Sequence, residues 1–440
     1  MGGRLEVLEG RRMLCATLHG MLGDYSDLAS YGAHAGEPYG YADAVATESG
    51  IPTALSGAAL DAVARYVPMA PTAQLAWATG YFTPAATVDL QGSTTASGVA
   101  AAYPTIQANS AGLPLLQSRP NGAGLELFLD FSFDNGYYHR FSTDGDRDNY
   151  NFYEQRDILN AWREVAAAFS FLDVNVTTVR PTNNHDFAWI AITNEFVWGG
   201  EGGQPQIGQT RGAFAHHTFA LEGNVPGIIH ELGHNLGMWH SADYNYFGEK
   251  THEYTNGIGQ RDRTFLGSAW YGTGANYRFY NGRTSEAAWA SQDQIASALY
   301  WVSRNVGGDG FRPDDFGNDR ATALNLGSGA GAIQRDAYVE RPWDNDVFKI
   351  TPMTSGRWTF AANPLYLSTA RPVIQLEDAT GKVIAVDDDA GMGGSNFGAS
   401  FSADVQAGQT YYVRIAWDGD YSSLGYYNLA ISPCRRSSTR

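Results

Sequence analysis

The segment from His230 to His240 reads HELGHNLGMWH and holds the residue types of a catalytic metal site. On a helix, residues four apart share one face, so His230 and His234 can present their imidazoles to one metal ion. Glu231 lies one residue round from His230, close enough to reach a water on the ion without being a ligand. Gly237 can end the helix with a positive φ and turn the chain so that His240 supplies a third imidazole. Three neutral imidazoles leave one position open for water, as in catalytic zinc sites.

This spacing is specific. HExxH arises by chance in roughly one such chain in a hundred, and the added Gly and His lower this to about three in a hundred thousand. An alternative ligand scheme uses Glu253, which falls nineteen residues after His234. That is the spacing of gluzincin aminopeptidases, where the glutamate arrives on a second helix and is the third zinc ligand. The loop before Glu253 contains Gly237 and Gly248 and does not read as helix–turn–helix, and this scheme leaves His240 without a role.

The pattern H-E-x-x-H-x-x-G-x-x-H resembles the signature of the metzincin metallopeptidases, of the bacterial reprolysin-like kind. The resemblance implies that His230, His234 and His240 are zinc ligands and that Glu231 is the catalytic base. It also implies an α/β (α+β) domain with a twisted mixed sheet and two long helices, the second bearing the motif. A smaller lower part would follow Gly237, and an edge strand above the cleft would bind extended substrate.

The chain departs from this family at the methionine-containing turn that metzincins place under the zinc. No methionine occurs between Met238 and Met353. The best counterpart is Thr264-Phe265-Leu266-Gly267, where Leu266 would replace the methionine. Leucine and methionine have similar volumes, so a hydrophobic floor could survive the exchange at modest cost. The departure puts activity in question more than metal binding.

The elements that must position the motif can be read from hydrophobic periodicity. The pattern predicts three helices, over Asp157–Phe171, Pro226–Leu236 with Asn224 as N-cap, and Ser291–Ser303. It also predicts strands over Leu125–Phe133, Val174–Val179, Asp186–Ile192 and Arg211–Leu221. The last of these is the candidate edge strand, and it carries His216 and His217. These two histidines could line the cleft, although ordinary strand histidines are the more common case.

After Gly307–Gly310 the pattern changes to short strands separated by Asp, Gly and Asn turns, which favours a separate β-sandwich. In Thr410–Trp417 the apolar residues alternate most clearly. The segments DDFGND (314–319), DNDVF (344–348), AGQTYYV (407–413) and GYYNL (425–429) resemble the bacterial pre-peptidase C-terminal (PPC) domain. This resemblance implies an extracellular, all-β, jelly-roll-like accessory domain. Asp387–Asp389 and the pair Asp344/Asp346 could hold calcium, or be solvated turn residues.

Composition narrows the class of protein. The 440 residues carry a formal net charge of −17, which argues against nucleic acid or an anionic membrane as the main partner. No apolar run reaches the roughly 18 residues of a transmembrane helix. Only two cysteines, Cys15 and Cys434, are present, so a disulfide framework and a thiolate cluster are excluded. Sequence leaves the oligomeric state and the substrate specificity open.

We expect five regions along the chain. Residues 1–24 are a targeting-like segment, in which Leu8–Leu14 resembles a short segment of large extracellular bacterial proteins. Residues 25–120 are a low-complexity linker or pro-segment, with a possible short helix in Leu55–Val67. A zinc metallopeptidase domain over 121–308, the PPC-like sandwich over 309–433 and a tail over 434–440 follow.

Two hypotheses of function follow from these residues. The first is a secreted zinc endopeptidase that cleaves protein or peptide substrates with metal-activated water, Glu231 being the general base. The second is a non-enzymatic extracellular metal-binding or adhesion protein with a degenerate site, for which Leu266 is the support. The gluzincin-type aminopeptidase using Glu253 remains a third reading.

Overall fold

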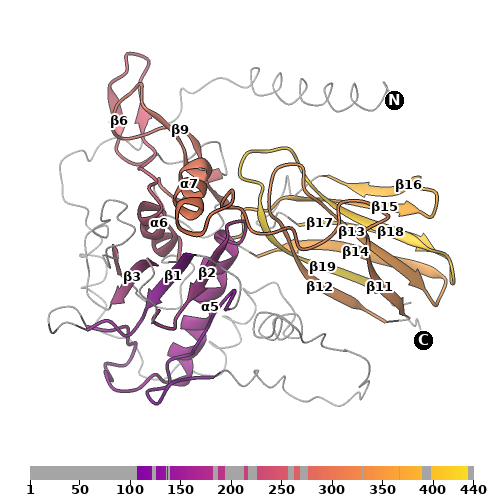
Figure 1. Ribbon diagram of the computed structural model, residues 1–440, viewed down its shortest axis with the longest axis horizontal. Coiled ribbons are helices and arrows are strands. Elements are labelled where there is room, and N and C mark those ends of the chain that lie inside the picture. Colours follow the sequence, from indigo (N-terminus) through magenta and orange to yellow (C-terminus); the bar gives the residue numbers. More distant parts are fainter. Residues whose placement is uncertain are drawn as a thin grey trace, which may run out of the picture. The chain divides into compact units, whose positions relative to one another are not determined.

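The computed structural model describes residues 107–120, 125–134, 136, 139–181, 187–193, 213–216, 225–255, 262–267, 276–329, 331–365, 367–388 and 398–434. These residues form an α/β part that is followed by a mostly antiparallel β part (Figure 1). The targeting-like segment, the helix expected in Leu55–Val67 and the helix cap expected at Asn224 lie outside the described residues. Among the described helices, none has the length and apolar character needed to cross a membrane.

The α/β part is built on a four-stranded sheet. Its strands are β1 (Leu125–Asp130), β2 (Val174–Thr177), β3 (Phe187–Thr193) and β4 (Ala213–His216), in the order β2-β1-β3-β4. All three pairings are parallel, so the mixed sheet that we expected is wrong for the described strands. The 19 residues between β3 and β4 are long enough for the crossover that a parallel pairing requires, whereas a hairpin would have given an antiparallel edge.

The first helix of this part, α5 (Phe152–Ala168), begins five residues earlier than the apolar stripe predicts. A capping box explains the difference: the Asn151 side chain accepts from the backbone N–H of Glu154, and the Glu154 carboxylate accepts from the N–H of Asn151. Trp162 is fully buried and donates its indole N–H to the carbonyl of Val176 at 2.9 Å, which ties α5 to β2.

The motif helix, α6 (Val225–Asn235), is apolar and buried along most of its length and packs on β3 and β4. It ends in a Schellman motif, because the N–H of Met238 bonds the carbonyl of Gly233 and the N–H of Gly237 bonds that of His234. Gly237 has φ 75°, which confirms the predicted glycine turn. The Gln292 side chain holds this turn, since it accepts from Trp239 N and donates to Gly237 O, both at 2.7 Å.

Three two-stranded sheets and a third helix follow the motif. The strands are β5 (Asp243–Tyr244) with β6 (Lys250–His252), β7 (Asp262–Thr264) with β8 (Asn276–Arg278), and β9 (Asn281–Arg283) with β10 (Ser291–Asp293). Helix α7 (Gln294–Val306) has Asp293 as its N-cap and ends at Gly307, close to the predicted bounds. Ser297 of α7 donates to the carbonyl of Gly237 at 2.9 Å, so α7 also supports the turn after the motif helix.

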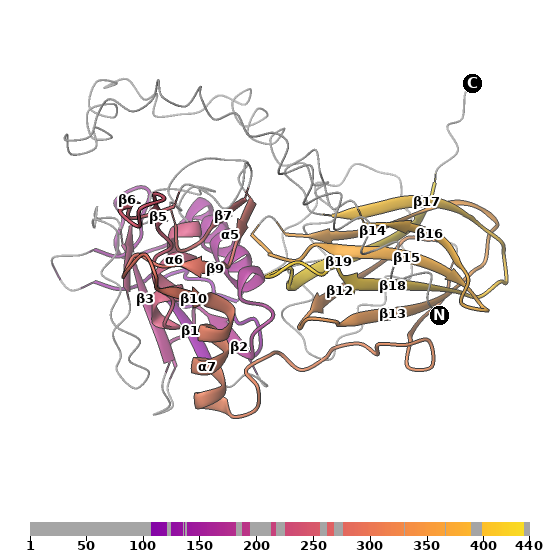
Figure 2. The ribbon, with the colours of Figure 1, turned by 90° about the horizontal axis from the view of Figure 1, so that it is seen from above.

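Residues 324–433 form two sheets, as expected of a β-sandwich (Figure 2). One sheet has the order β11-β13-β18-β15-β16, with β11 (Leu324–Gly329), β13 (Asn345–Pro352), β18 (Tyr411–Trp417), β15 (Pro372–Asp378) and β16 (Val383–Asp387). The other has the order β12-β19-β14-β17, with β12 (Ile333–Val339), β19 (Gly425–Pro433), β14 (Gly356–Pro364) and β17 (Ala399–Val405). Tyr411, Val413 and Ile415 are buried, which confirms the alternation predicted for this strand.

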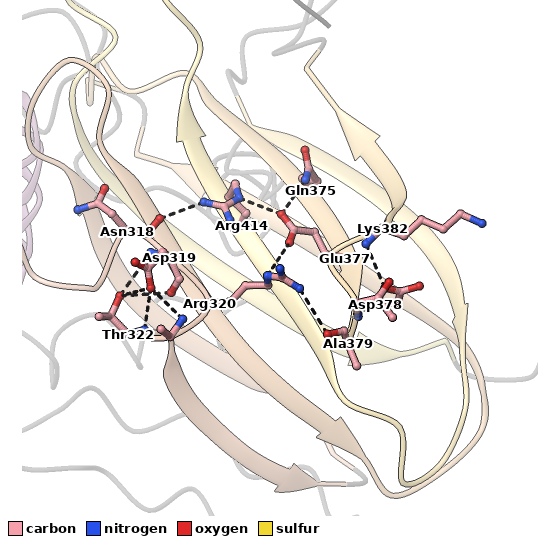
Figure 3. Close-up of polar contacts among 12 residues, drawn as sticks. Asn318, Asp319, Arg320, Thr322, Gln375, Glu377, Asp378, Ala379, Lys382 and Arg414 are labelled. Carbon is pink, nitrogen blue, oxygen red and sulfur yellow. Dashed lines mark hydrogen bonds and ion pairs between the residues drawn. The ribbon is translucent and has the colours of Figure 1, made fainter. Parts of the chain in front are cut away.

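A network of polar contacts holds the segment before β11 on the first sheet (Figure 3). Arg414 of β18 donates to the carbonyl of Asn318 at 3.1 Å and to the Glu377 carboxylate at 3.0 Å. The guanidinium of Arg320 lies 3.8 Å from the same carboxylate. Glu377 is buried, so these two cations compensate its charge and fix the path of residues 318–320.

The turn after the motif helix gives a direct test of this fold. A Cβ at Gly237 would overlap the indole of Trp301, whereas a Cβ at Gly145, which also has positive φ, would meet nothing within 4 Å. We expect Gly145→Ala to cost about 1–2 kcal/mol from the backbone conformation alone, and Gly237→Ala to cost about 3 kcal/mol or more. Urea unfolding of both variants measures this, and equal losses would contradict the described turn.

Candidate metal centre

The three histidines of the motif converge on one point. Nε2 of His234 lies 3.1 Å from Nε2 of His230 and 2.9 Å from Nε2 of His240. Among the described residues, these three form a group of potential metal ligands whose ligand atoms all lie within 4.8 Å of one another. His230 and His234 come from one face of α6, and the glycine turn brings His240 to the same place.

The far side of two rings is held by backbone carbonyls. Nδ1 of His230 lies 2.7 Å from the carbonyl oxygen of Phe265, and Nδ1 of His234 lies 2.7 Å from that of Met238. A carbonyl oxygen can only accept a hydrogen bond, so Nδ1 must carry the proton in both rings. In the neutral rings Nε2 is then unprotonated and carries a lone pair. The Nε2 atoms of His230 and His234 lie 3.1 Å apart, so their two lone pairs face each other. A cation shared by the two rings would satisfy both nitrogens.

A proton is a poor candidate for this cation. Burial lowers the pKa of His230 well below its ordinary value of 6.5, and the neighbouring histidines lower it further. Burial likewise lowers the pKa of His234 to about 4, and it lowers the pKa of His240. The rings are therefore neutral near pH 7, which is the form that binds a metal. A donor set of three imidazole nitrogens fits zinc.

Glu231 follows the first histidine and is almost fully buried, with 1% of its surface exposed. In the part of the chain that the structure describes, neither carboxylate oxygen has a hydrogen-bond partner. Burial raises the pKa of Glu231 to about 9 in the absence of a cation. A carboxylate that is left bare in this way is compensated when a divalent ion and a water lie beside it.

The floor under the motif helix is apolar, as the sequence predicts. Leu266 is fully buried in the turn after Thr264, and its backbone carbonyl accepts from the N–H of Ser241 at 2.9 Å. A Cβ at Gly233 would lie 3.0 Å from Cδ2 of Leu266 and 3.2 Å from Sδ of Met238. Leu266 therefore lies where we expected a methionine, and the methionine inside the motif shares the floor with it.

Glu253 lies beside the histidines but outside their ligand group. Its Oε1 is 3.6 Å from Nδ1 of His240, and its Oε2 accepts from Nζ of Lys250 at 2.6 Å. It follows the short strand β6 and is not carried by a helix. This carboxylate therefore faces the far side of the third ring, a common place for a group that orients a zinc ligand. The geometry disfavours the scheme in which it replaces His240.

The structure adds residues that spacing alone did not reveal. Phe265 and Met238 act through their backbone carbonyls, which carry no sequence signal. The ring of Tyr254 packs against His240, with 4.5 Å between ring centroids. Of the expected cleft residues, His217 and the side chain of His216 lie outside the described residues.

The candidate calcium residues separate into two cases. Asp344 and Asp346 each belong to an acidic group that could hold a cation. Asp387 and Asp388 belong to no such group among the described residues, and Asp389 lies outside them. Asp387 instead accepts from the backbone N–H of Ser400 at 2.7 Å.

Comparisons with known proteins match only part of the chain. No protein-family model matches it, and no curated protein matches it. Among solved structures, the PPC domain of a Bacillus anthracis collagenase matches with 13% identity and a TM-score of 0.20, over 28% of this chain and 98% of that chain. A periplasmic inhibitor of g-type lysozyme from Aeromonas hydrophila matches with 10% identity and a TM-score of 0.19, over 25% and 96% of the two chains.

The buried rings make the metal-free protein sensitive to acid. Because the folded-state pKa of His234 is about 4 and its ordinary value is 6.5, the unfolded chain takes up the proton first. This contribution to stability is complete above about pH 6.5 and is lost as the pH falls towards 4. With chelator present, we expect the Tm of the wild type to fall more between pH 7 and 5 than that of His234→Gln. An equal or larger fall in the variant would contradict the assignment.

Proposed function

We propose that the protein is a zinc-dependent endopeptidase of the metzincin type, acting on extracellular protein or peptide substrates. One observation carries the proposal: the Nε2 atoms of His230, His234 and His240 gather at one point, and the residue after His230, Glu231, has a buried carboxylate that no described residue satisfies. The extracellular setting is a further part of the proposal and draws on the resemblance of the C-terminal segments to a PPC domain.

His230, His234 and His240 would hold the zinc ion. When bound, zinc acts as a Lewis acid that polarises the scissile carbonyl and activates water. The carbonyls of Phe265 and Met238 keep two of the rings in the tautomer that exposes Nε2. Burial keeps all three rings neutral, so protons do not compete with the ion at neutral pH.

Glu231 would accept a proton from the attacking water at one carboxylate oxygen and pass it to the leaving amine. Its burial suits this role because a poorly solvated carboxylate is a stronger base than an exposed one. It needs a nearby positive charge to be ionised near pH 7, and the ion supplies that charge. Glu231 would therefore be ionised near pH 7, and able to act as the base, only when zinc is bound.

Replacing the carboxylate by its amide tests this role. We expect Glu231→Gln to keep one zinc per chain and to lose about 10²-fold or more of its activity on quenched peptides and unfolded protein. His230→Ala should lose both zinc and activity. Full activity in Glu231→Gln, or in the metal-free wild type, would contradict the mechanism. Zinc uptake by a wild type that cleaves nothing would favour the non-enzymatic alternative.

Glu253→Gln separates the two ligand schemes. If this residue orients His240 from outside the ligand group, we expect the variant to bind zinc about 10–100-fold more weakly with unchanged stoichiometry. Glu249→Gln is the control, because it changes a neighbouring carboxylate that accepts from the Asn245 side chain. Loss of the zinc site in Glu253→Gln with retention in His240→Ala would support the gluzincin arrangement instead.

A further inference from the structure

A second group of potential ligands lies in the β part of the chain. It consists of Asp314, Asp315, Glu340, Asp344 and Asp346, called the acidic cluster below. Single oxygens of Asp314, Glu340 and Asp344 lie within 4.8 Å of one another, and so do oxygens of Asp314, Asp315 and Asp346. The first two residues precede β11, Glu340 and Asp344 lie between β12 and β13, and Asp346 is the second residue of β13.

Three residues of the acidic cluster are more buried than solvated turn residues would be, whereas Asp314 is exposed and Asp315 is half-buried. Glu340 is fully buried, Asp346 is 1% exposed and Asp344 is 5% exposed. Oδ1 of Asp315, Oε2 of Glu340 and Oδ1 of Asp346 are buried and have no hydrogen-bond partner among the described residues. Buried carboxylate oxygens are normally satisfied, and leaving three of them bare in one place is costly. The guanidinium of Arg312 acts on Asp315, but the bare oxygens of Glu340 and Asp346 call for a further positively charged ligand.

The other oxygens of these carboxylates are held by neutral donors. Oε1 of Glu340 accepts from the N–H of Asp315, and Oδ2 of Asp344 accepts from the N–H of Glu340, both at 3.1 Å. Tyr427 donates its hydroxyl to Oδ2 of Asp346 at 2.5 Å. These donors orient the side chains without neutralising them. Each of these three carboxylates is thus anchored through one oxygen, and Glu340 and Asp346 leave the other bare.

Contacts outside the acidic cluster bring its two segments together. The backbone N–H of Asn345 donates to Oδ1 of Asn318 at 2.8 Å, and that of Val347 donates to the carbonyl of Gly317 at 3.1 Å. Arg414 in turn holds the carbonyl of Asn318, as Figure 3 shows. The arrangement of the carboxylates is therefore imposed by the fold.

Oxygens of Asp314, Asp315 and Asp346 lie within 4.8 Å of one another, and carboxylates this close repel each other when they are ionised. A divalent cation removes both the repulsion and the orphaned oxygens. Calcium suits a set of only carboxylate oxygens from a loop and a turn, because it accepts six to eight oxygen ligands in variable geometry. Magnesium prefers fewer protein ligands and strict octahedral geometry.

We propose that the acidic cluster is a calcium site. This proposal goes beyond the zinc peptidase function and does not depend on it, because no residue is shared between the two sites. Calcium that binds the folded chain and not the unfolded one should raise the stability of the protein.

The test uses the full chain, freed of metal, and two measurements: calcium binding by calorimetry and the Tm with and without CaCl2. We expect the wild type to bind calcium and to show a higher Tm with it, and magnesium to have a smaller effect. Asp346→Asn should weaken calcium binding at least tenfold and abolish the rise in Tm. Asp404→Asn, which changes an exposed carboxylate of β17, should behave like the wild type.

The metal-free Tm distinguishes a ligand from a structural residue. Asp346→Asn removes a buried charge and keeps the shape, so its metal-free form should be at least as stable as the metal-free wild type. A lower metal-free Tm, a wild type without calcium binding, or equal effects of magnesium and calcium would each overturn the proposal. Zinc content should be unchanged in Asp346→Asn, and His230→Ala should still bind calcium, which keeps the two sites' tests separate.

Discussion

The candidate metal centre depends on what lies behind two imidazole rings. The carbonyls of Phe265 and Met238 can only accept hydrogen bonds, so they fix the proton on Nδ1 of His230 and His234. Each Nε2 then presents a lone pair to the other, in a place where burial keeps the rings neutral near pH 7. Without a cation this is an unfavourable contact, and with one it becomes a ligand set.

The fold supplies this constraint through a few local devices. The Schellman turn with Gly237 places the Met238 carbonyl behind His234 and redirects the chain to His240. The turn that contains Leu266 supports the helix from below and carries the Phe265 carbonyl. Side chains from β10 and α7 hold the glycine turn. The acidic cluster is similar in that one side of each potential ligand is hydrogen-bonded: backbone N–H groups and Tyr427 orient the carboxylates.

Sequence predicted what depends on short-range spacing. The helix with His230 and His234, the positive φ of Gly237 and the buried floor at Leu266 follow from local periodicity, conformation and volume. Prediction from the sequence failed for features that arise where segments distant in the chain come into contact. The parallel pairing of β4, the place of Glu253 beside His240 and the partners of Asp344 are set by tertiary contacts, which a spacing rule does not contain. Backbone carbonyls are common to all residues and were invisible for that reason.

The central claim is that three ring nitrogens share one zinc ion. Zinc K-edge X-ray absorption of the full chain, loaded with one equivalent of zinc, tests it most directly. We expect a first shell of three imidazole nitrogens and one oxygen, all at about 2.0–2.1 Å. A shell with fewer than three imidazoles, or with an added protein carboxylate, would contradict the claim. A spectrum of the zinc-loaded protein that equals the spectrum of free zinc would contradict it too.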